Sequence, residues 1–136
     1  MIGKKLVGKR NAVVTLNIGQ KVGLDSKVIS IEEVNRKLIK FTTNKSTEYI
    51  SGDELSKKFE IRKWKSGDKF QPIGMKGTKK VSDFLADVKI PSAEKKSHLV
   101  LINSGKIVWV IGLRIDEKFK VTPKSKKILK LTLSEI

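Results

Sequence analysis

Apolar and polar residues alternate with a period of two in several parts of the chain. Because successive side chains of a strand point to opposite faces of a sheet, this alternation indicates half-buried β-strands. A glycine or a Ser-Gly-Asp group ends two of these segments, as turns do. We therefore predict strands at residues 14–18, 47–50 and 129–133.

The clearest local signal is a β-hairpin. Two almost continuously apolar segments, residues 99–102 and 107–111, flank the tetrapeptide Asn103-Ser104-Gly105-Lys106. Gly105 supplies a residue that tolerates positive φ in the turn. Since neither segment alternates, we expect both faces of the hairpin to be covered, one of them by a helix at residues 81–88.

That helix is predicted by apolar residues at positions i, i+3, i+4 and i+7, and it must end near Pro91. Thr78 is a suitable N-cap, which would place Lys79 and Lys80 in the first turn. Cations there oppose the helix dipole at a cost of roughly 0.3–1 kcal/mol each, and a bound phosphate would reverse the sign. A solvated lysine pair is the alternative. The apolar stripe consists of Val81, Phe84, Leu85 and Val88.

Other segments give shorter or less distinct patterns. Residues 28–41 carry apolar side chains at helical spacing, with Ser30 and Glu33 as a capping box, although residues 38–43 would also serve as a strand. We favour a helix followed by a strand. A short strand at residues 59–64, one helical turn at 91–96 and another from Thr122-Pro123 to residue 127 complete the prediction. The fold class is therefore α+β: a small mixed sheet that includes the hairpin, packed with one to three short helices.

Charge adds a functional indication. The chain has 30 Lys and Arg against 14 Asp and Glu, a net charge of +16. Such an excess favours a polyanionic partner, most often nucleic acid, with an anionic membrane surface as the lesser alternative. Residues 11–58 carry 8 basic and 6 acidic side chains, whereas residues 59–136 carry 18 and 8. We predict a linker or smaller subdomain at 1–58 and a basic domain at 59–136.

Composition also excludes several classes of protein. There is no cysteine, so disulfides, thiolate chemistry and cysteine-ligated zinc are excluded. The N-terminus lacks the apolar core of a signal peptide, and the longest apolar segment, residues 107–113, is too short to span a bilayer. We expect a cytoplasmic protein without a membrane partner.

Catalytic and metal chemistry find little support. His98 has no acid or nucleophile near it in the sequence, and Asp116 and Glu117 are adjacent, so they would point in different directions. Asp83 and Asp87 share a helix face, which suits ion pairs with lysine as readily as magnesium. Neither a G-x-x-x-x-G-K-[ST] loop nor a G-x-G-x-x-G fingerprint occurs. We expect no catalytic residue and no metal site.

Candidate binding chemistry is concentrated in residues 62–80, R-K-W-K-S-G-D-K-F-Q-P-I-G-M-K-G-T-K-K. Glycine and proline make this backbone turn repeatedly, and a cation-rich loop with accessible amides suits an anion. Gly74-Met75-Lys76-Gly77 also matches the G-x-x-G loop of KH domains, but the proline upstream argues against the helix that such a loop requires. The aromatic residues are scattered along the chain, and we expect Trp109 to lie in the core. Base stacking is therefore disfavoured relative to contacts with phosphate and ribose.

Residues 59–133 resemble the C-terminal domain of tRNA(Ile)-lysidine synthetase. The run G-D-K-F-Q-P-I-G-M-K-G-T-K-K-V-S-D-F-L-A-D-V-K-I-P fits the family pattern G-D-x-F-x-P-x-G-M-x-G-x-K-K-x-x-D-F-x-x-D-x-K-I-P, and W-V-I-G-L-R fits W-V-x-G-x-R. Lys69 stands where many members have arginine, Ile111 where many have proline, and Ser51 where an acid is usual.

The resemblance implies a role in tRNA modification. The parent enzyme is an ATP-dependent ligase that adenylates the wobble cytidine of tRNA(Ile) and attaches lysine, and it uses ATP, magnesium and lysine. Its chemistry belongs to a PP-loop domain with an S-G-G-x-D-S motif, which this sequence lacks. The chain therefore looks like a C-terminal fragment without catalytic residues or a cofactor of its own, whose family role is to hold the acceptor stem of tRNA(Ile).

A double-stranded stem is recognised through its backbone and 2′-hydroxyls, which requires a basic surface poor in aromatic residues. A free-standing, nonspecific nucleic-acid-binding protein and an enzyme acting on a small anion are the alternatives. We assign loop shaping to Gly67, Asp68, Pro72, Gly74, Gly77 and Thr78, with Asp68 fixing the loop or orienting an arginine. The predicted phosphate contacts are Arg62, Lys65, Lys69, Lys76, Lys79, Lys80, Arg114 and Lys118.

Overall fold

A computed structural model describes residues 13–24, 26–40 and 46–135, and all strand pairings within them are antiparallel. The first sheet contains, in spatial order, β1 (Val14–Asn17), β5 (Lys58–Lys63), β8 (Leu99–Asn103), β9 (Lys106–Val110) and β10 (Arg114–Ile115). The second sheet contains β2 (Lys21–Leu24), β3 (Lys27–Val34), β11 (Ile128–Glu135) and β4 (Thr47–Ser51). A two-stranded ribbon pairs β6 (Lys69–Phe70) with β7 (Lys79–Lys80), and the helices are α1 (Val81–Asp87) and α2 (Ser92–Lys95).

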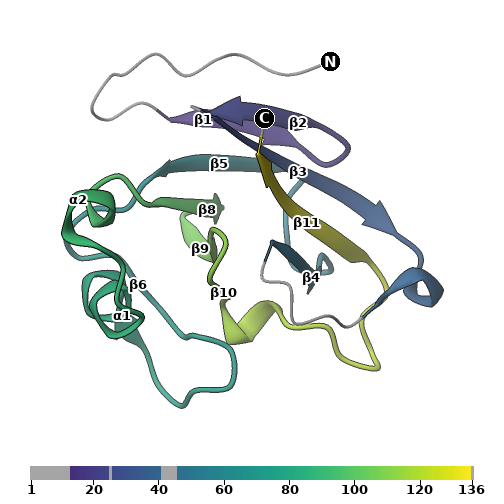
Figure 1. The fold of residues 1–136 in the computed structure, drawn as a ribbon. Helices are drawn as coiled ribbons and strands as arrows, with labels where there is room; N and C mark the ends of the chain where they lie inside the picture. Colours follow the sequence, from purple (N-terminus) through teal and green to yellow (C-terminus); the bar gives the residue numbers. More distant parts are fainter. Residues whose placement is uncertain (1–12, 25, 41–45, 136) are drawn as a thin grey trace.

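The elements form three layers, with the first sheet in the middle (Figure 1). One apolar core lies between the two sheets and includes Phe59 and Trp109 from the first sheet and Ile31 and Leu131 from the second. A second core lies between the first sheet and α1, where the rings of Phe70 and Phe84 meet edge to face at 5.1 Å.

The predicted α+β class is confirmed, and so is the hairpin. β8 and β9 pair through a turn in which Ser104 and Gly105 have φ of 50° and 80°. Val108 faces the inter-sheet core and Val110 faces α1, so the hairpin is covered on both faces as its continuous apolar pattern indicated. The strands predicted near residues 14, 47, 59 and 129 are also present.

The helix predicted over residues 28–41 is wrong. Residues 27–34 form strand β3, followed by a short 3₁₀ helix, Arg36–Leu38. Ile29 and Ile31 are fully buried at a spacing of two, and β11 pairs with the whole strand. The strand expected at 38–43 is not observed at residues 38–40, and residues 41–43 lie outside the described part of the chain.

Two smaller expectations are also wrong. Thr122-Pro123 begins a hydrogen-bonded turn, in which the Ser125 amide donates to the Thr122 carbonyl at 3.0 Å, and not a helical turn. Thr78 is not the N-cap of α1: Lys80 occupies that position without a side-chain hydrogen bond. Lys79 and Lys80 are extended because they pair with β6, and the Val81 amide donates to the Asp68 carbonyl at 2.9 Å.

The position near residue 58 at which the charge changes is not a boundary between the two large sheets. β1 pairs with β5, and β11 lies between β3 and β4, so each large sheet takes strands from both sides of this position. No helix among the described residues is long and apolar enough to cross a membrane.

Candidate nucleic-acid interface

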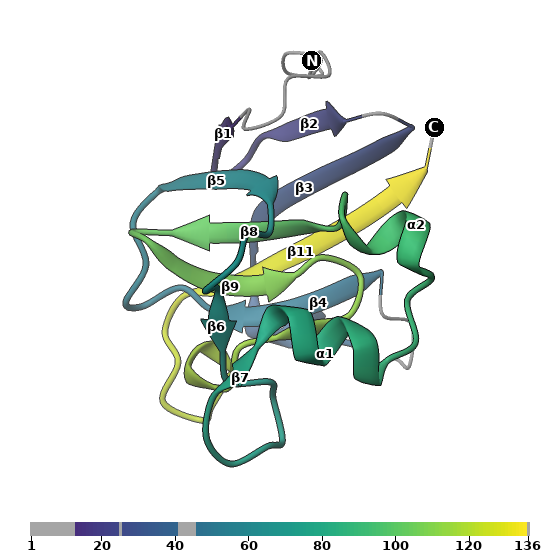
Figure 2. The same ribbon diagram turned by 90° about the vertical axis from the view of Figure 1, so that its left-hand side faces the viewer.

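The basic segment forms a projecting ribbon and loop at one end of the molecule (Figure 2). β6 and β7 are its two strands, and residues 71–78 connect them. Gly74 and Gly77 have φ of +83° and +74°, and a Cβ on either would have no heavy atom within 4 Å. The loop therefore needs these glycines for backbone conformation and not to avoid a clash.

Arg62 and Asp68 form a clamp at the base of the ribbon. Two parallel bonds join the guanidinium to the carboxylate, at 2.8 and 3.1 Å, and the Lys65 amide donates to the same carboxylate at 2.8 Å. Partial burial acts to raise the pKa of Asp68, but the bonds from Arg62 and Lys65 outweigh it and hold the pKa below its ordinary value. Asp68 thus orients Arg62 and closes the turn at residues 65–68.

Two further carboxylates tether the loop to the segment after β10. Asp116, buried in the protein, accepts from the Gln71 amide at 3.0 Å, and Pro72 lies across from it. Glu117 accepts from the Gly74 amide at 2.9 Å; this bond and the contact with Lys120 lower its pKa. The expectation that the loop presents free amides to an anion is therefore wrong for these positions, since the protein's own carboxylates occupy them.

Half of the predicted cationic side chains are engaged within the protein. Arg62 binds Asp68 and the Lys63 carbonyl, Lys79 pairs with Asp87, Lys118 with Asp116, and Arg114 donates to the Ile73 carbonyl. The other four are exposed, and no ion pair to a described residue is observed for them: Lys65, Lys69, Lys76 and Lys80.

Lys69 and Lys80 stand directly opposite each other in the ribbon. Like charges in a cross-strand pair destabilise a sheet, by amounts of the order of 0.2–1 kcal/mol. A polyanion placed over the pair would offset this repulsion.

A lysine the sequence analysis missed belongs to the same surface. A depression of ≈ 400 Å³ lies between the turn at Gly67 and the hairpin turn at Gly105, and Lys69, Lys106 and Lys118 line it. Lys106 is 26 positions beyond Lys80 in the chain, and only the pairing of β8 with β5 and β9 brings its turn beside the ribbon. We call the four exposed lysines together with Lys106 and Lys118 the lysine surface.

The residues considered for catalysis, metal binding or base stacking contact other parts of the protein. The His98 ring bonds the Ile111 carbonyl at 2.9 Å, and burial lowers its pKa. Asp87 pairs with Lys79, and the described residues contain no group of three or more potential metal ligands close together. Trp109 is fully buried in the inter-sheet core. None of these side chains forms an acid–base or nucleophilic arrangement.

Fold and site together define a basic, two-sheet α+β domain with a lysine-rich ribbon that the protein's own carboxylates hold in place. The family model of the TilS substrate C-terminal domain matches residues 59–132. The chain belongs to this family, and the resemblance drawn from the sequence motifs is confirmed.

Relatives and a solved structure agree with this assignment. The chain is 33% identical, over 93% of its own length, to the tRNA(Ile)-lysidine synthase of Clostridium acetobutylicum, and 41% identical, over 63%, to that of Parabacteroides distasonis. It spans only 28% and 20% of those two proteins. A structure entitled "Crystal structure of TILS C-terminal domain" shares the fold, with a TM-score of 0.78 and 19% identity over 92% of this chain and 98% of that one.

Proposed function

We propose that this chain is the tRNA-binding C-terminal module of a tRNA(Ile)-lysidine synthase and that its lysine surface holds the acceptor stem of tRNA(Ile). The chemistry would reside in a separate catalytic domain of a cytoplasmic ligase, supplied there with ATP, magnesium and lysine. The family match supports the parent enzyme, and the Lys69–Lys80 pair supports the docking role.

The lysine surface suits a duplex better than a small anion. Its cations extend from the ribbon to the hairpin turn, so they can follow successive phosphates along a strand. The Lys65, Gln71 and Gly74 amides, which could have bound a single phosphate, donate instead to Asp68, Asp116 and Glu117. This arrangement argues against an enzyme that acts on a small anionic substrate in the glycine loop.

Competition binding at matched salt tests the function. The module should bind folded tRNA more tightly than single-stranded RNA or duplex DNA, because an A-form stem presents 2′-hydroxyls in a wide minor groove. Equal affinities for all three would favour a nonspecific nucleic-acid-binding protein. Tight, saturable binding of inorganic phosphate, undisturbed by tRNA, would favour the small-anion enzyme.

A further inference from the structure

The depression between the ribbon and the hairpin turn gathers lysines from three separate segments. Lys69 comes from β6, Lys106 from the start of β9 and Lys118 from the short 3₁₀ helix after β10. Gly67 and Gly105 also line it, and a Cβ on either would have no heavy atom within 4 Å. The lining therefore combines cations with open space at two turns.

Two carboxylates line the same depression, and each already has a cationic partner. Asp68 accepts two bonds from the guanidinium of Arg62, at 2.8 and 3.1 Å. The side chain of Asp116 is only 2% exposed and pairs with the Lys118 ammonium group at 3.2 Å. These pairs offset one another, so the two carboxylates do not cancel the charge of the other lysines.

The positive charge that remains is that of Lys69 and Lys106, which form no ion pair with any residue that the structure describes. A diester of an RNA backbone carries one negative charge. A phosphate monoester carries about −1.5 to −2 at pH 7, because its second pKa is about 6. Two unpaired cations in one depression therefore match a monoester better than a diester.

The size of the depression agrees with such a ligand. Its volume of ≈ 400 Å³ lies within the roughly 300–1,000 Å³ of sites that hold small molecules, so a phosphate and the ribose that carries it fit together. Lysine suits this ligand because its ammonium group is a compact point charge that can contact any of the three terminal oxygens.

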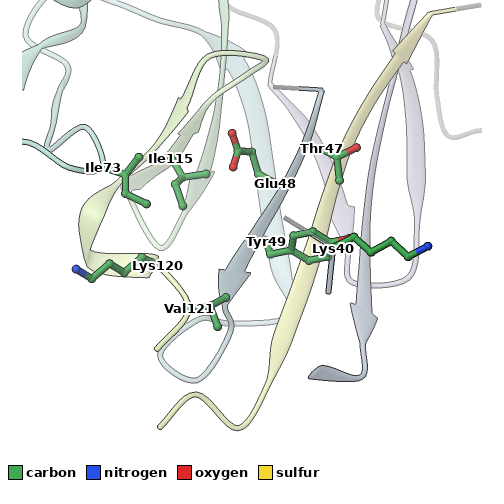
Figure 3. A pocket seen from close by; sticks show the side chains of 8 residues that line it. All are labelled: Lys40, Thr47, Glu48, Tyr49, Ile73, Ile115, Lys120 and Val121. Carbon is green, nitrogen blue, oxygen red and sulfur yellow. The ribbon is translucent and has the colours of Figure 1, made fainter. Parts of the chain in front are cut away.

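Another depression, of ≈ 230 Å³, does not concentrate charge in this way. It opens where β4 faces the segment that follows β10 (Figure 3). Its two lysines, Lys40 and Lys120, point to opposite sides in this view, and Lys120 pairs with Glu117. The lysine-lined depression is therefore the better site for a doubly charged anion.

We infer that this depression takes a terminal phosphate monoester, the 5′-phosphate of the RNA whose stem lies on the lysine surface. The inference rests on the proposed function and adds to it the position of one end of the stem. In RNA a phosphate monoester occurs only at a chain end, and in a mature tRNA it is the 5′ end of the acceptor stem. Lys69 and Lys106 bind the phosphate, and Lys118 contributes from the opposite wall.

Three forms of one blunt RNA hairpin test the site: one with a 5′-phosphate, one with a 5′-hydroxyl, and one with a phosphate at the 3′ end instead. The 5′-phosphate form should bind about 5-fold or more tightly than the hydroxyl form, since two exposed ion pairs contribute that much. The 3′-phosphate form should bind like the hydroxyl form, because it places the same charge on the other strand. The ³¹P resonance of the 5′-phosphate, which is separate from those of the diesters, should shift on binding. An unmoved resonance, or an equal gain from the 3′-phosphate, would overturn the inference.

A matched pair of variants assigns the preference to the depression. Lys106→Gln removes one unpaired charge and should reduce the preference for the 5′-phosphate to less than about 2-fold. Lys76→Gln removes an exposed lysine of the lysine surface outside the depression, so it should weaken binding of both forms alike and keep the preference. An equal loss of preference in the two variants would mean that the whole surface, and not the depression, responds to the added charge.

Inorganic phosphate distinguishes an RNA end from a free anion. At millimolar concentration and constant ionic strength, it should compete with the 5′-phosphate hairpin and leave binding of the hydroxyl hairpin unchanged. Tight binding of inorganic phosphate that the 5′-phosphate hairpin does not displace would assign the depression to a small free anion and overturn the inference. If the hairpins bind with equal affinities, the end site is wrong and the stem-docking function stands. If no hairpin binds at all, both proposals fail.

Discussion

At the scale of single residues, the charged side chains of the basic segment divide into two groups. One group builds the loop, as Arg62 does through its paired bonds with Asp68. The other group, which includes Lys69 and Lys80, is exposed and mutually repulsive. The two groups are mixed along the chain, so counting cations in the sequence cannot separate the structural residues from the proposed binding residues. Substitutions at single positions should separate them.

Lys80→Glu should weaken RNA binding and leave the fold at least as stable. The change replaces a repulsive cross-strand pair with an attractive one, worth a few tenths to about 1 kcal/mol in the free energy of unfolding. Removing a phosphate contact should lower the slope of log K against log salt by about 0.9 on a duplex. Thermal unfolding and tRNA titrations at several salt concentrations measure the two effects. Lys21→Glu, on β2, is the charge-matched control and should leave the slope unchanged.

Asp68→Asn should destabilise the protein at pH 7 by about 1–3 kcal/mol, because Arg62 loses a charged partner in a largely buried clamp. The pKa of Asp68 is lower in the folded than in the unfolded state, so its contribution to stability is present above the unfolded pKa of about 3.9 and is lost as pH falls through the folded pKa. The free energies of unfolding of the two proteins, measured in urea, should therefore begin to converge as the pH falls below about 4 and should meet below the folded pKa of Asp68. A difference that persisted there would assign the loss to packing.

At the scale of elements, the position of the ribbon depends on the segment after β10 more than on the ribbon itself. β6 and β7 contribute only two residues each, and a ribbon this short is not stable alone. Asp116 holds it by accepting from the Gln71 amide at 3.0 Å, and accepts from the Lys118 amide at 2.8 Å. A carboxylate 45 positions away in sequence thus fixes the loop geometry.

Asp116→Ala should leave two amide N–H groups without their acceptor in a buried site, at a cost of about 2–4 kcal/mol. Hydrogen exchange should show the loss of protection at the Gln71 amide before any global unfolding. Glu117→Ala is the control: it releases the Gly74 amide at the exposed tip and should leave Gln71 protected. Unchanged exchange at Gln71 in the Asp116 variant would mean that the loop is held by packing of Pro72 and Phe70.

Local signals in the sequence predicted the elements that depend on local chemistry. The hairpin at Gly105 and the stripe of α1 follow from turn residues and periodicity. Val81, Phe84 and Leu85 of the stripe are buried, whereas Val88 follows the helix and is exposed. β3 was missed because Val28, Ile31 and Val34 also fit helical spacing; its strand conformation depends on pairing with β11, about a hundred residues later. Lys106 was missed for the same reason, since its place beside the ribbon depends on the order of strands in the first sheet.

At the scale of the whole molecule, the basic part of the chain and the folded sheets have different boundaries in the sequence. The excess of positive charge lies in residues 59–136, and the family model begins at residue 59. Both large sheets nevertheless combine strands from the two parts. β11 supplies Leu129 and Leu131 to the inter-sheet core from a position between β3 and β4, so the last strand completes a sheet begun by the first part of the chain.

The fragment 59–136 should therefore fail to fold cooperatively by itself. It would lack β1 beside β5 and both neighbours of β11, and would expose the inner faces of Phe59, Ile61 and Leu131, which are at most 1% exposed when both sheets are present. Unpaired apolar edges of this kind also promote association. Co-expression with the fragment 1–58 should restore a single thermal transition and RNA binding, because the missing strands can pair without a covalent link. A sharp transition in 59–136 alone would instead show that the first sheet and its helix layer suffice for folding, and would make the charge boundary a true domain boundary.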